Sequence, residues 1–129
     1  MANVRFPKVT ITGGAGYVGS MLVPYLIDRG HEVTVLDTFW YGEDVYPGLK
    51  DRSKLKLVKG DIRNPADRRK GFFGSDAVLH LACVSNDPSF DLQPELGKSI
   101  NYDCFGEILR AVKESGAKRF VYASSSSVY

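Results

Sequence analysis

The sequence has little cysteine, little net charge and no long apolar run. Its only cysteines, Cys83 and Cys104, are interpreted as small buried hydrophobic residues rather than as disulfide partners or metal ligands. The formal net charge of +2 is too small to indicate a nucleic-acid partner or to exclude one. No segment approaches the roughly twenty apolar residues of a membrane span, and residues 1–8 lack the apolar core of a signal peptide. We therefore expect a cytoplasmic protein without a membrane partner or a metal site.

The residues that are present have the composition of an ordinary globular domain, with 43% hydrophobic and 25% charged residues. A chain of 129 residues can bury roughly two thirds of the surface that it exposes when unfolded. The sequence has no internal repeat of short period and no linker. We expect one domain over residues 1–129.

A glycine-rich turn follows the first predicted strand. The β-branched segment 9–12 predicts a buried strand, and glycines follow it at positions 13, 14, 16 and 19. This spacing fits G-x-x-G-x-x-G and G-x-G-x-x-G, which cradle phosphate groups when they join a strand to a helix. Gly16 permits close approach of a pyrophosphate, and Gly19 permits the next helix to pack close to the sheet. The N-terminus of that helix favours anions.

An acidic residue ends the second predicted strand. Segment 32–36 leads into Asp37, about twenty residues beyond the glycine turn. A carboxylate at this position can accept hydrogen bonds from the ribose hydroxyl groups of NAD, and it would repel the 2′-phosphate of NADP. The spacing therefore predicts a preference for NAD.

Strands and helical patterns alternate along the rest of the chain. Helices are expected at 17–29 and 94–115, with a short helix after Asn64-Pro65, and strands at 55–58, 77–82 and 119–123. This alternation predicts an α/β fold, a Rossmann-type doubly wound parallel sheet of about five strands, incomplete in this chain. Ligands of such sheets lie at the carboxyl ends of the strands, so the residues that follow each strand are expected to meet at one edge.

The first helix should bury one apolar face. The residues at helical spacing on that face are Val18, Met21, Leu22, Tyr25 and Leu26. Gly30 should end this helix, and Pro24 should kink it without breaking it.

Three features have both a structural and a functional interpretation. The aromatic residues of segments 39–41 and 46–48 could border a ligand, but packing onto the sheet edge is favoured. His80 lies within an apolar strand and is interpreted as hydrogen-bonded structure rather than as an acid, base or ligand. The basic run 68–70 is interpreted as a solvated helix face, so no nucleic-acid partner is expected.

These motifs, in this order and at this spacing, resemble the extended short-chain dehydrogenase/reductase family, and specifically the NAD-dependent sugar-nucleotide epimerases and dehydratases. The likeness extends from Lys8 to Tyr129. The matching segments are 12–19, 37, 60–63, 80–82, 100–101 and 120–129.

The resemblance implies a role for each matching residue. The residues implied to hold the NAD pyrophosphate are Gly13, Gly16, Tyr17, Val18 and Gly19. Those implied around the adenosine are Asp37 and Thr38 at the ribose and Asp61 and Ile62 at the adenine. Those implied near the nicotinamide, or in ordering the site, are Leu81, Ala82, Asn101 and Ser124. Ser125 is implied to be the catalytic serine near the substrate hydroxyl, with Ser124 and Ser126 as alternatives because the four consecutive serines leave the register open.

The family's reaction is hydride transfer between a nucleotide sugar and bound NAD, with a tyrosine base in a Tyr-x-x-x-Lys helix turn. Neither that helix nor the substrate-binding lobe is expected in this chain, because Tyr129 belongs to the serine motif. The chain therefore resembles the NAD-binding front half of such an enzyme, not competent for catalysis by itself. Members of the resembled family commonly form homodimers through the helix that corresponds to 94–115 and a later partner helix, which is not expected in this chain, so the sequence leaves the oligomeric state open.

Two alternatives stay open on the sequence. A stand-alone, non-catalytic NAD-binding or NAD-sensing module is favoured by the missing base and lysine, but the serine motif and an unpaired fifth strand oppose it. An S-adenosylmethionine methyltransferase would share the glycine-rich turn and the acid after the second strand. The three-glycine spacing and the serine motif oppose that alternative.

Overall fold

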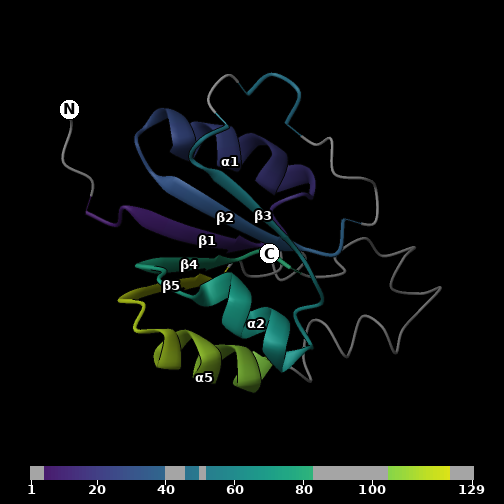
Figure 1. Cartoon of the computed structure of the whole chain (residues 1–129), viewed down its shortest axis with the longest axis vertical. Coiled ribbons are helices and arrows are strands. Elements are labelled where there is room, and N and C mark those ends of the chain that lie inside the picture. Colours follow the sequence, from purple (N-terminus) through teal and green to yellow (C-terminus); the bar gives the residue numbers. More distant parts are fainter. Residues whose placement is uncertain (1–4, 40–45, 50–51, 83–104, 123–129) are drawn as a thin grey trace, which may run out of the picture.

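The computed structural model describes residues 5–39, 46–49, 52–82 and 105–122. Its elements, in chain order, are β1 (Lys8–Thr12), α1 (Tyr17–Asp28), β2 (Glu32–Asp37), β3 (Leu55–Lys59), α2 (Pro65–Phe72), β4 (Ala77–His80), α5 (Phe105–Ser115) and β5 (Arg119–Tyr122). The strands form one parallel sheet in the order β3-β2-β1-β4-β5. The predicted Rossmann-type parallel sheet is confirmed (Figure 1).

Helices cover both faces of the sheet. Figure 1 shows α1 on one face and α2 with α5 on the other. Successive side chains of a strand point to opposite faces, so the central strands contribute to a core on each side. The core under α1 contains Val9, Ile11, Val23, Ile27, Val33, Val35, Phe39, Tyr46 and Ala77. The core under α2 and α5 contains Leu36, Val58, Ile62, Phe72, Val78, Ile108 and Val112.

The buried face of α1 differs from the predicted one. Val23 and Ile27 are 0% and 4% exposed and face the sheet. Of the predicted face, Leu22 and Leu26 are partly buried, whereas Val18, Met21 and Tyr25 are more than half exposed. The prediction was wrong because α1 is apolar over a wider arc than the sheet covers, so periodicity alone does not fix its rotation.

The ends of α1 follow the sequence signals. The helix continues through Pro24 to Asp28, with Arg29 as its C-cap. Gly30 follows in a left-handed conformation, with φ 97°. The predicted end at Gly30 is confirmed, and Pro24 does not break the helix.

The start of α2 agrees with the predicted Asn64 cap, but the basic run 68–70 is not fully exposed to solvent as expected. The side-chain oxygen of Asn64 accepts hydrogen bonds from the first turn of α2, as its cap position predicts. Arg69 and Lys70 are exposed. Arg68 is only 6% exposed and donates from Nη1 to the Ile62 carbonyl at 3.0 Å, so the expectation of a solvated face is wrong for this residue. Of the expected helix 94–115, residues 94–104 lie outside the described ranges.

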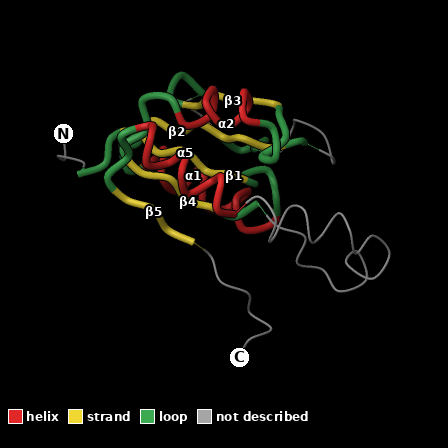
Figure 2. The backbone as a smooth tube through the Cα atoms, turned by 90° about the horizontal axis from the view of Figure 1, so that it is seen from below, coloured by secondary structure: helices red, strands yellow, loops and turns green. Residues whose placement is uncertain are grey.

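Because all five strands are parallel, their carboxyl ends lie along one edge of the sheet. β3 and β5 are the outer strands, and Figure 2 shows β5 at the border of the fold. Within the described ranges, no helix is long and apolar enough to cross a membrane.

Candidate cofactor-binding site

The glycine turn after β1 is wedged between the ends of β2 and β4. Gly13 has φ 70°, and its N–H donates to the Leu36 carbonyl at 2.8 Å. A Cβ atom on Gly13 would lie 2.7 Å from the backbone N and Cα atoms of Ala82. The positive φ and the close approach both require glycine at this position.

Gly19 and Gly16 differ in what surrounds them. A Cβ atom on Gly19 would lie 2.2 Å from the Gly14 carbonyl oxygen, so α1 packs directly on the turn. A Cβ atom on Gly16 would meet only the Gly13 carbonyl oxygen, at 3.4 Å. The fold therefore requires glycine at position 19, whereas the space outside Gly16 is open to an approaching group.

The N-terminus of α1 has no side-chain cap among the residues that the structure describes. Gly16 is the N-cap residue and has no side chain that could accept from the first turn, and that turn contains no acidic residue. The Ser20 N–H donates to the Gly16 carbonyl at 2.8 Å. The N–H groups of Tyr17, Val18 and Gly19 precede this hydrogen bond and have no helical acceptor. Together with the helix dipole they favour an anion at this point.

Asp37 ends β2 beside the turn. Its Oδ2 accepts from the Ala15 N–H at 3.0 Å, and its Oδ1 accepts from the Phe39 N–H at 2.8 Å. Its backbone carbonyl accepts from the Gly60 N–H at 2.9 Å, which joins the ends of β2 and β3. Each carboxylate oxygen has a further lone pair, so this half-buried group can also accept from hydroxyl groups of a ligand. Thr38, the next residue, is half-buried as well.

Asp61 and Ile62 follow β3 and differ in burial. Arg63 donates to both Asp61 carboxylate oxygens, and these hydrogen bonds hold the pKa of that carboxyl below its ordinary value. The Ile62 side chain is buried in the core under α2 and α5, and its carbonyl accepts from Arg68. Of the two residues, only Asp61 has a partly exposed side chain at this edge.

A hydroxyl group of β1 fixes the end of β4. Thr12 Oγ1 accepts from the N–H groups of Leu81 and Ala82, at 3.1 Å and 3.2 Å. Its own proton therefore goes to Nδ1 of His80, 2.6 Å away, and the imidazole is neutral with its proton on Nε2. Burial lowers the His80 pKa to about 4, which agrees with the neutral form. His80 is thus buried, hydrogen-bonded structure, as predicted.

Phe39 and Tyr46 pack in the core under α1 rather than bordering a ligand. They are 6% and 2% exposed, so the packing interpretation is confirmed for these two aromatic residues. The Tyr46 hydroxyl donates to the Gly14 carbonyl at 2.5 Å. Burial and the nearby charge of Asp37 raise the Tyr46 pKa, so the hydroxyl stays protonated. Trp40 and Tyr41 lie outside the described residues.

The contact of Tyr46 with the turn was not predicted. The expectation that a Tyr-x-x-x-Lys pair is missing is wrong for the sequence itself, because Tyr46 and Lys50 have this spacing. Pro47 and Gly48 between them do not suit a helix, however. The Tyr46 hydroxyl is bound to the turn inside the core, so it is not placed as a base. The sequence shows only that Tyr46 lies in a connection that contains Pro-Gly. That observation does not identify Gly14 as the partner of the tyrosine hydroxyl.

Several predicted residues lie outside the described ranges. They are Asn101, Ser124, Ser125 and Ser126, together with Cys83 and Cys104. In residues 5–39, 46–49, 52–82 and 105–122, no group of His, Cys, Asp or Glu side chains is arranged to hold a metal ion.

The described residues fit a dinucleotide. The open space outside Gly16 and the uncapped helix N-terminus suit a pyrophosphate, and the Asp37 carboxylate beside them suits a ribose. These groups, with the ends of β3 and β4, lie at the carboxyl edge of the sheet.

The model of the NAD dependent epimerase/dehydratase family matches residues 9–129. The chain belongs to this family. Membership confirms the predicted resemblance, and NAD is the cofactor of the family. The methyltransferase alternative receives no support.

Individual relatives agree with this assignment. A 3-beta-hydroxysteroid dehydrogenase of Mycolicibacterium neoaurum is 33% identical over 125 residues, which cover 94% of this chain and 32% of that protein. A UDP-glucose 4-epimerase of Streptomyces lividans is 34% identical over 125 residues, which cover 95% of this chain and 37% of that protein. The crystal structure of a Thermus thermophilus UDP-glucose 4-epimerase in complex with NAD matches with a TM-score of 0.78 at 28% identity, covering 91% of this chain and 37% of that chain. This chain spans about a third of the length of these relatives.

Proposed function

We propose that this chain is the NAD-binding part of an enzyme that acts on a nucleotide sugar as an epimerase or a dehydratase. The observation that carries the proposal is the uncapped N-terminus of α1 next to the Asp37 carboxylate. A helix end that favours anions, placed beside an acceptor for ribose hydroxyl groups, suits the two charged and polar parts of NAD. Membership of an NAD-dependent family supports the same cofactor.

The proposed contacts divide the cofactor along the sheet edge. Gly13 and Gly16 leave room for the pyrophosphate, and the N–H groups of Tyr17, Val18 and Gly19 donate to it. Asp37 accepts from the adenosine ribose, with Thr38 beside it. The remaining proposed contacts are Asp61 and Ile62 at the adenine, Leu81 and Ala82 toward the nicotinamide, and Asn101 and Ser124 in ordering the site. Ile62 would act through its main chain, because its side chain is buried in the core.

NAD, when bound, supplies the acceptor for a hydride from the substrate and its donor on return. Ser125 is proposed to bind the substrate hydroxyl, while the tyrosine base comes from outside these 129 residues. A nucleotide sugar is the first candidate substrate because of the UDP-glucose 4-epimerase relatives, and a hydroxysteroid is the second because of the steroid dehydrogenase relative. A stand-alone NAD-sensing module is not favoured, since the relatives named above are enzymes.

Self-association and location belong to the same proposal. Two copies would pair through a surface that includes α5, where the apolar residue Leu109 is 42% exposed. The enzyme would act in the cytoplasm.

The test is cofactor titration of the protein expressed from its complete gene, by isothermal calorimetry with NAD and with NADP. We expect NAD to bind more tightly than NADP. Asp37→Asn should raise the dissociation constant for NAD about tenfold or more, because a hydrogen bond to a charged group is worth about 1.5–3 kcal/mol. The same variant should narrow the preference for NAD, since the repulsion of the 2′-phosphate is removed.

Asp76→Asn is the matched control. The Asp76 carboxylate also accepts a hydrogen bond from a backbone N–H, that of Lys8 at 2.9 Å, but it lies at the opposite edge of the sheet. The NAD affinity of the Asp76→Asn variant should therefore stay unchanged. Failure of the unmodified protein to bind NAD would overturn the proposal. Reduction of bound NAD by UDP-glucose, or by a 3β-hydroxysteroid instead, then separates the two substrate classes.

A further inference from the structure

One peptide unit of the glycine turn is held at both of its polar ends. The carbonyl of Gly14 accepts from the Tyr46 hydroxyl at 2.5 Å. The N–H of Ala15, which belongs to the same peptide plane, donates to Asp37 Oδ2 at 3.0 Å. Asp37 ends β2, and Tyr46 comes from the connection that leads from β2 to β3. Both side chains that hold this peptide therefore come from the end of β2 or from the connection that follows it.

The orientation of this peptide affects the groups that follow it. It directly precedes Gly16, the N-cap of α1, whose own N–H donates to the Gly13 carbonyl at 3.1 Å. Gly14, on the N-terminal side of this peptide, leaves it more conformational freedom than a residue with a side chain would. Fixing the peptide in the free protein removes that freedom before a ligand arrives, which raises affinity by lowering the ordering cost.

Tyr46 is itself held firmly. Its side chain is 2% exposed and packs in the core under α1. Its backbone carbonyl accepts from Arg52 Nη2 at 2.7 Å and from the Leu49 N–H at 3.1 Å. A buried ring on an anchored backbone presents its hydroxyl to the turn in one position.

We propose that Tyr46 is a positioning residue for the cofactor: its hydroxyl, together with Asp37, orients the Gly14–Ala15 peptide so that the turn receives the pyrophosphate. The inference rests on the proposed function and adds a residue to it. Tyr46 is buried and acts through the turn, so it does not need to touch the cofactor.

The test compares Tyr46→Phe with Thr10→Val in the protein expressed from its complete gene. Each variant removes one buried hydroxyl that donates to a backbone carbonyl, that of Gly14 at 2.5 Å or that of Gly71 at 2.8 Å. Both should lower the melting temperature. Tyr46→Phe should also raise the dissociation constant for NAD about fivefold to tenfold, the size expected for one hydrogen bond. Thr10→Val should leave that constant within about twofold, because Thr10 lies away from the turn.

Ligand fragments distinguish positioning from general loosening of the site. Tyr46→Phe should weaken NAD and ADP by the same factor, since both carry the pyrophosphate, and should leave adenosine unchanged. Arg52→Met, which removes the exposed anchor of the Tyr46 backbone, should show the same pattern at about twofold to threefold. This second variant keeps the core intact if Tyr46→Phe does not fold.

Three outcomes are decisive. Tyr46→Phe with a lower melting temperature and unchanged NAD affinity would show that the tyrosine is structural only, and the inference would fail. Equal weakening of adenosine, ADP and NAD would also overturn it. Absence of NAD binding in the unmodified protein would instead contradict the proposed function, and is seen before any variant is made.

Discussion

Thr10 and Thr12 lie two residues apart on β1 and point to the same face of the sheet, yet their hydroxyl groups stabilise different ends of the molecule. Thr10 Oγ1 donates to the Gly71 carbonyl and is hydrogen-bonded to the Ser75 hydroxyl, which joins the end of α2 to the approach of β4. Thr12 Oγ1 holds Leu81 and Ala82, the segment against which the glycine turn packs. A threonine hydroxyl thus joins two structural elements in the case of Thr10, and fixes the surroundings of the candidate site in the case of Thr12.

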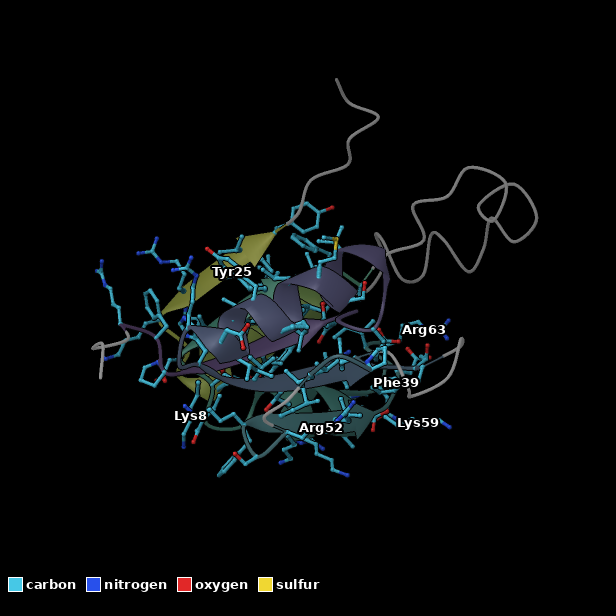
Figure 3. The ribbon with its side chains drawn as sticks, turned by 90° about the horizontal axis from the view of Figure 1, so that it is seen from above. Lys8, Tyr25, Phe39, Arg52, Lys59 and Arg63 are labelled. Atoms are coloured by element: carbon cyan, nitrogen blue, oxygen red, sulfur yellow. The ribbon has the colours of Figure 1, made fainter. Side chains whose placement is uncertain are left out.

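The two edges of the sheet differ in the same way. A groove of about 310 Å³ lies at the amino ends of β1, β2 and β3, with Lys8, Lys54 and Phe73 among its lining residues. In Figure 3, Lys8 lies at this end, and Phe39, Lys59 and Arg63 lie at the opposite end. The carboxyl edge carries the uncapped N-terminus of α1 and the Asp37 carboxylate instead. We locate the candidate site by its polar backbone groups rather than by the volume of the groove. In such folds the helix N-termini point to the carboxyl edge of the sheet.

The largest expected effect comes from adding one methyl group to each of two glycines of the turn. Gly19→Ala places Cβ 2.2 Å from a backbone oxygen that cannot move aside, and should destabilise the protein by about 3 kcal/mol or more. Gly16→Ala meets only one atom at 3.4 Å and should change stability by less than about 1 kcal/mol. It should nevertheless weaken NAD more than tenfold, because the methyl group occupies the space left for the pyrophosphate.

Urea denaturation and calorimetry of both variants separate these two effects. Gly106→Ala, on α5, is the control, since within the described residues its new Cβ atom has no neighbour within 4 Å beyond its own stretch of helix. It should leave NAD affinity unchanged. Unaltered NAD affinity in Gly16→Ala would mean that the turn does not contact the pyrophosphate.

Most of the fold could be predicted because its signals are local. β-branched runs marked the strands, and glycine or Asn-Pro marked helix ends. The rotation of α1 could not be obtained from hydrophobic periodicity, since the large hydrophobic residues Val18, Met21 and Tyr25 also lie at helical spacing and yet are exposed. A steric argument fixes it instead: Gly19 must face the turn, and Val23 and Ile27 follow at four-residue spacing on the same side.

The residues of the candidate site also differ in whether local sequence signals predict their positions. The glycines and Asp37 were predictable because their spacing follows from the size of one strand-helix-strand unit. Tyr46 was not, since its partner Gly14 lies 32 residues away and an irregular connection sets no register between them. Arg68 was missed for a related reason: a basic run on a short helix does not show that one member reaches the Ile62 carbonyl.

A smaller effect should follow from the titratable side chain of the Thr12 network at the carboxyl edge. His80 is neutral and buried, with a pKa of about 4, whereas an unfolded histidine has a pKa near 6.5. The unfolded state therefore takes up a proton first, so stability should be lost as the pH falls from about 6.5 to about 4 and should level off below that. The expected loss is about 3 kcal/mol.

Denaturation of the unmodified protein and of His80→Gln between pH 4 and pH 8 measures this loss. Glutamine keeps an acceptor for the Thr12 hydroxyl but does not titrate, so the slope above pH 4 should flatten in the variant. The lowered pKa of Asp61 acts at lower pH, below the ordinary carboxyl value of 3.8, and does not interfere. Equal slopes in the two proteins would place the acid sensitivity elsewhere.

The smallest expected difference concerns one exposed apolar residue at each edge. Phe73, 88% exposed, lines the amino-edge groove, and Val18, 58% exposed, stands in the first turn of α1. Phe73→Ser and Val18→Ser should each change stability by about 0.5 kcal/mol or less, because neither side chain is buried in the free protein. A bound cofactor would cover Val18 and not Phe73, so only Val18→Ser should raise the dissociation constant for NAD, by about threefold for the apolar area that binding buries. A comparable loss of NAD affinity in Phe73→Ser would show that the groove at the amino edge also affects cofactor binding. The contrast between the two edges would then no longer hold.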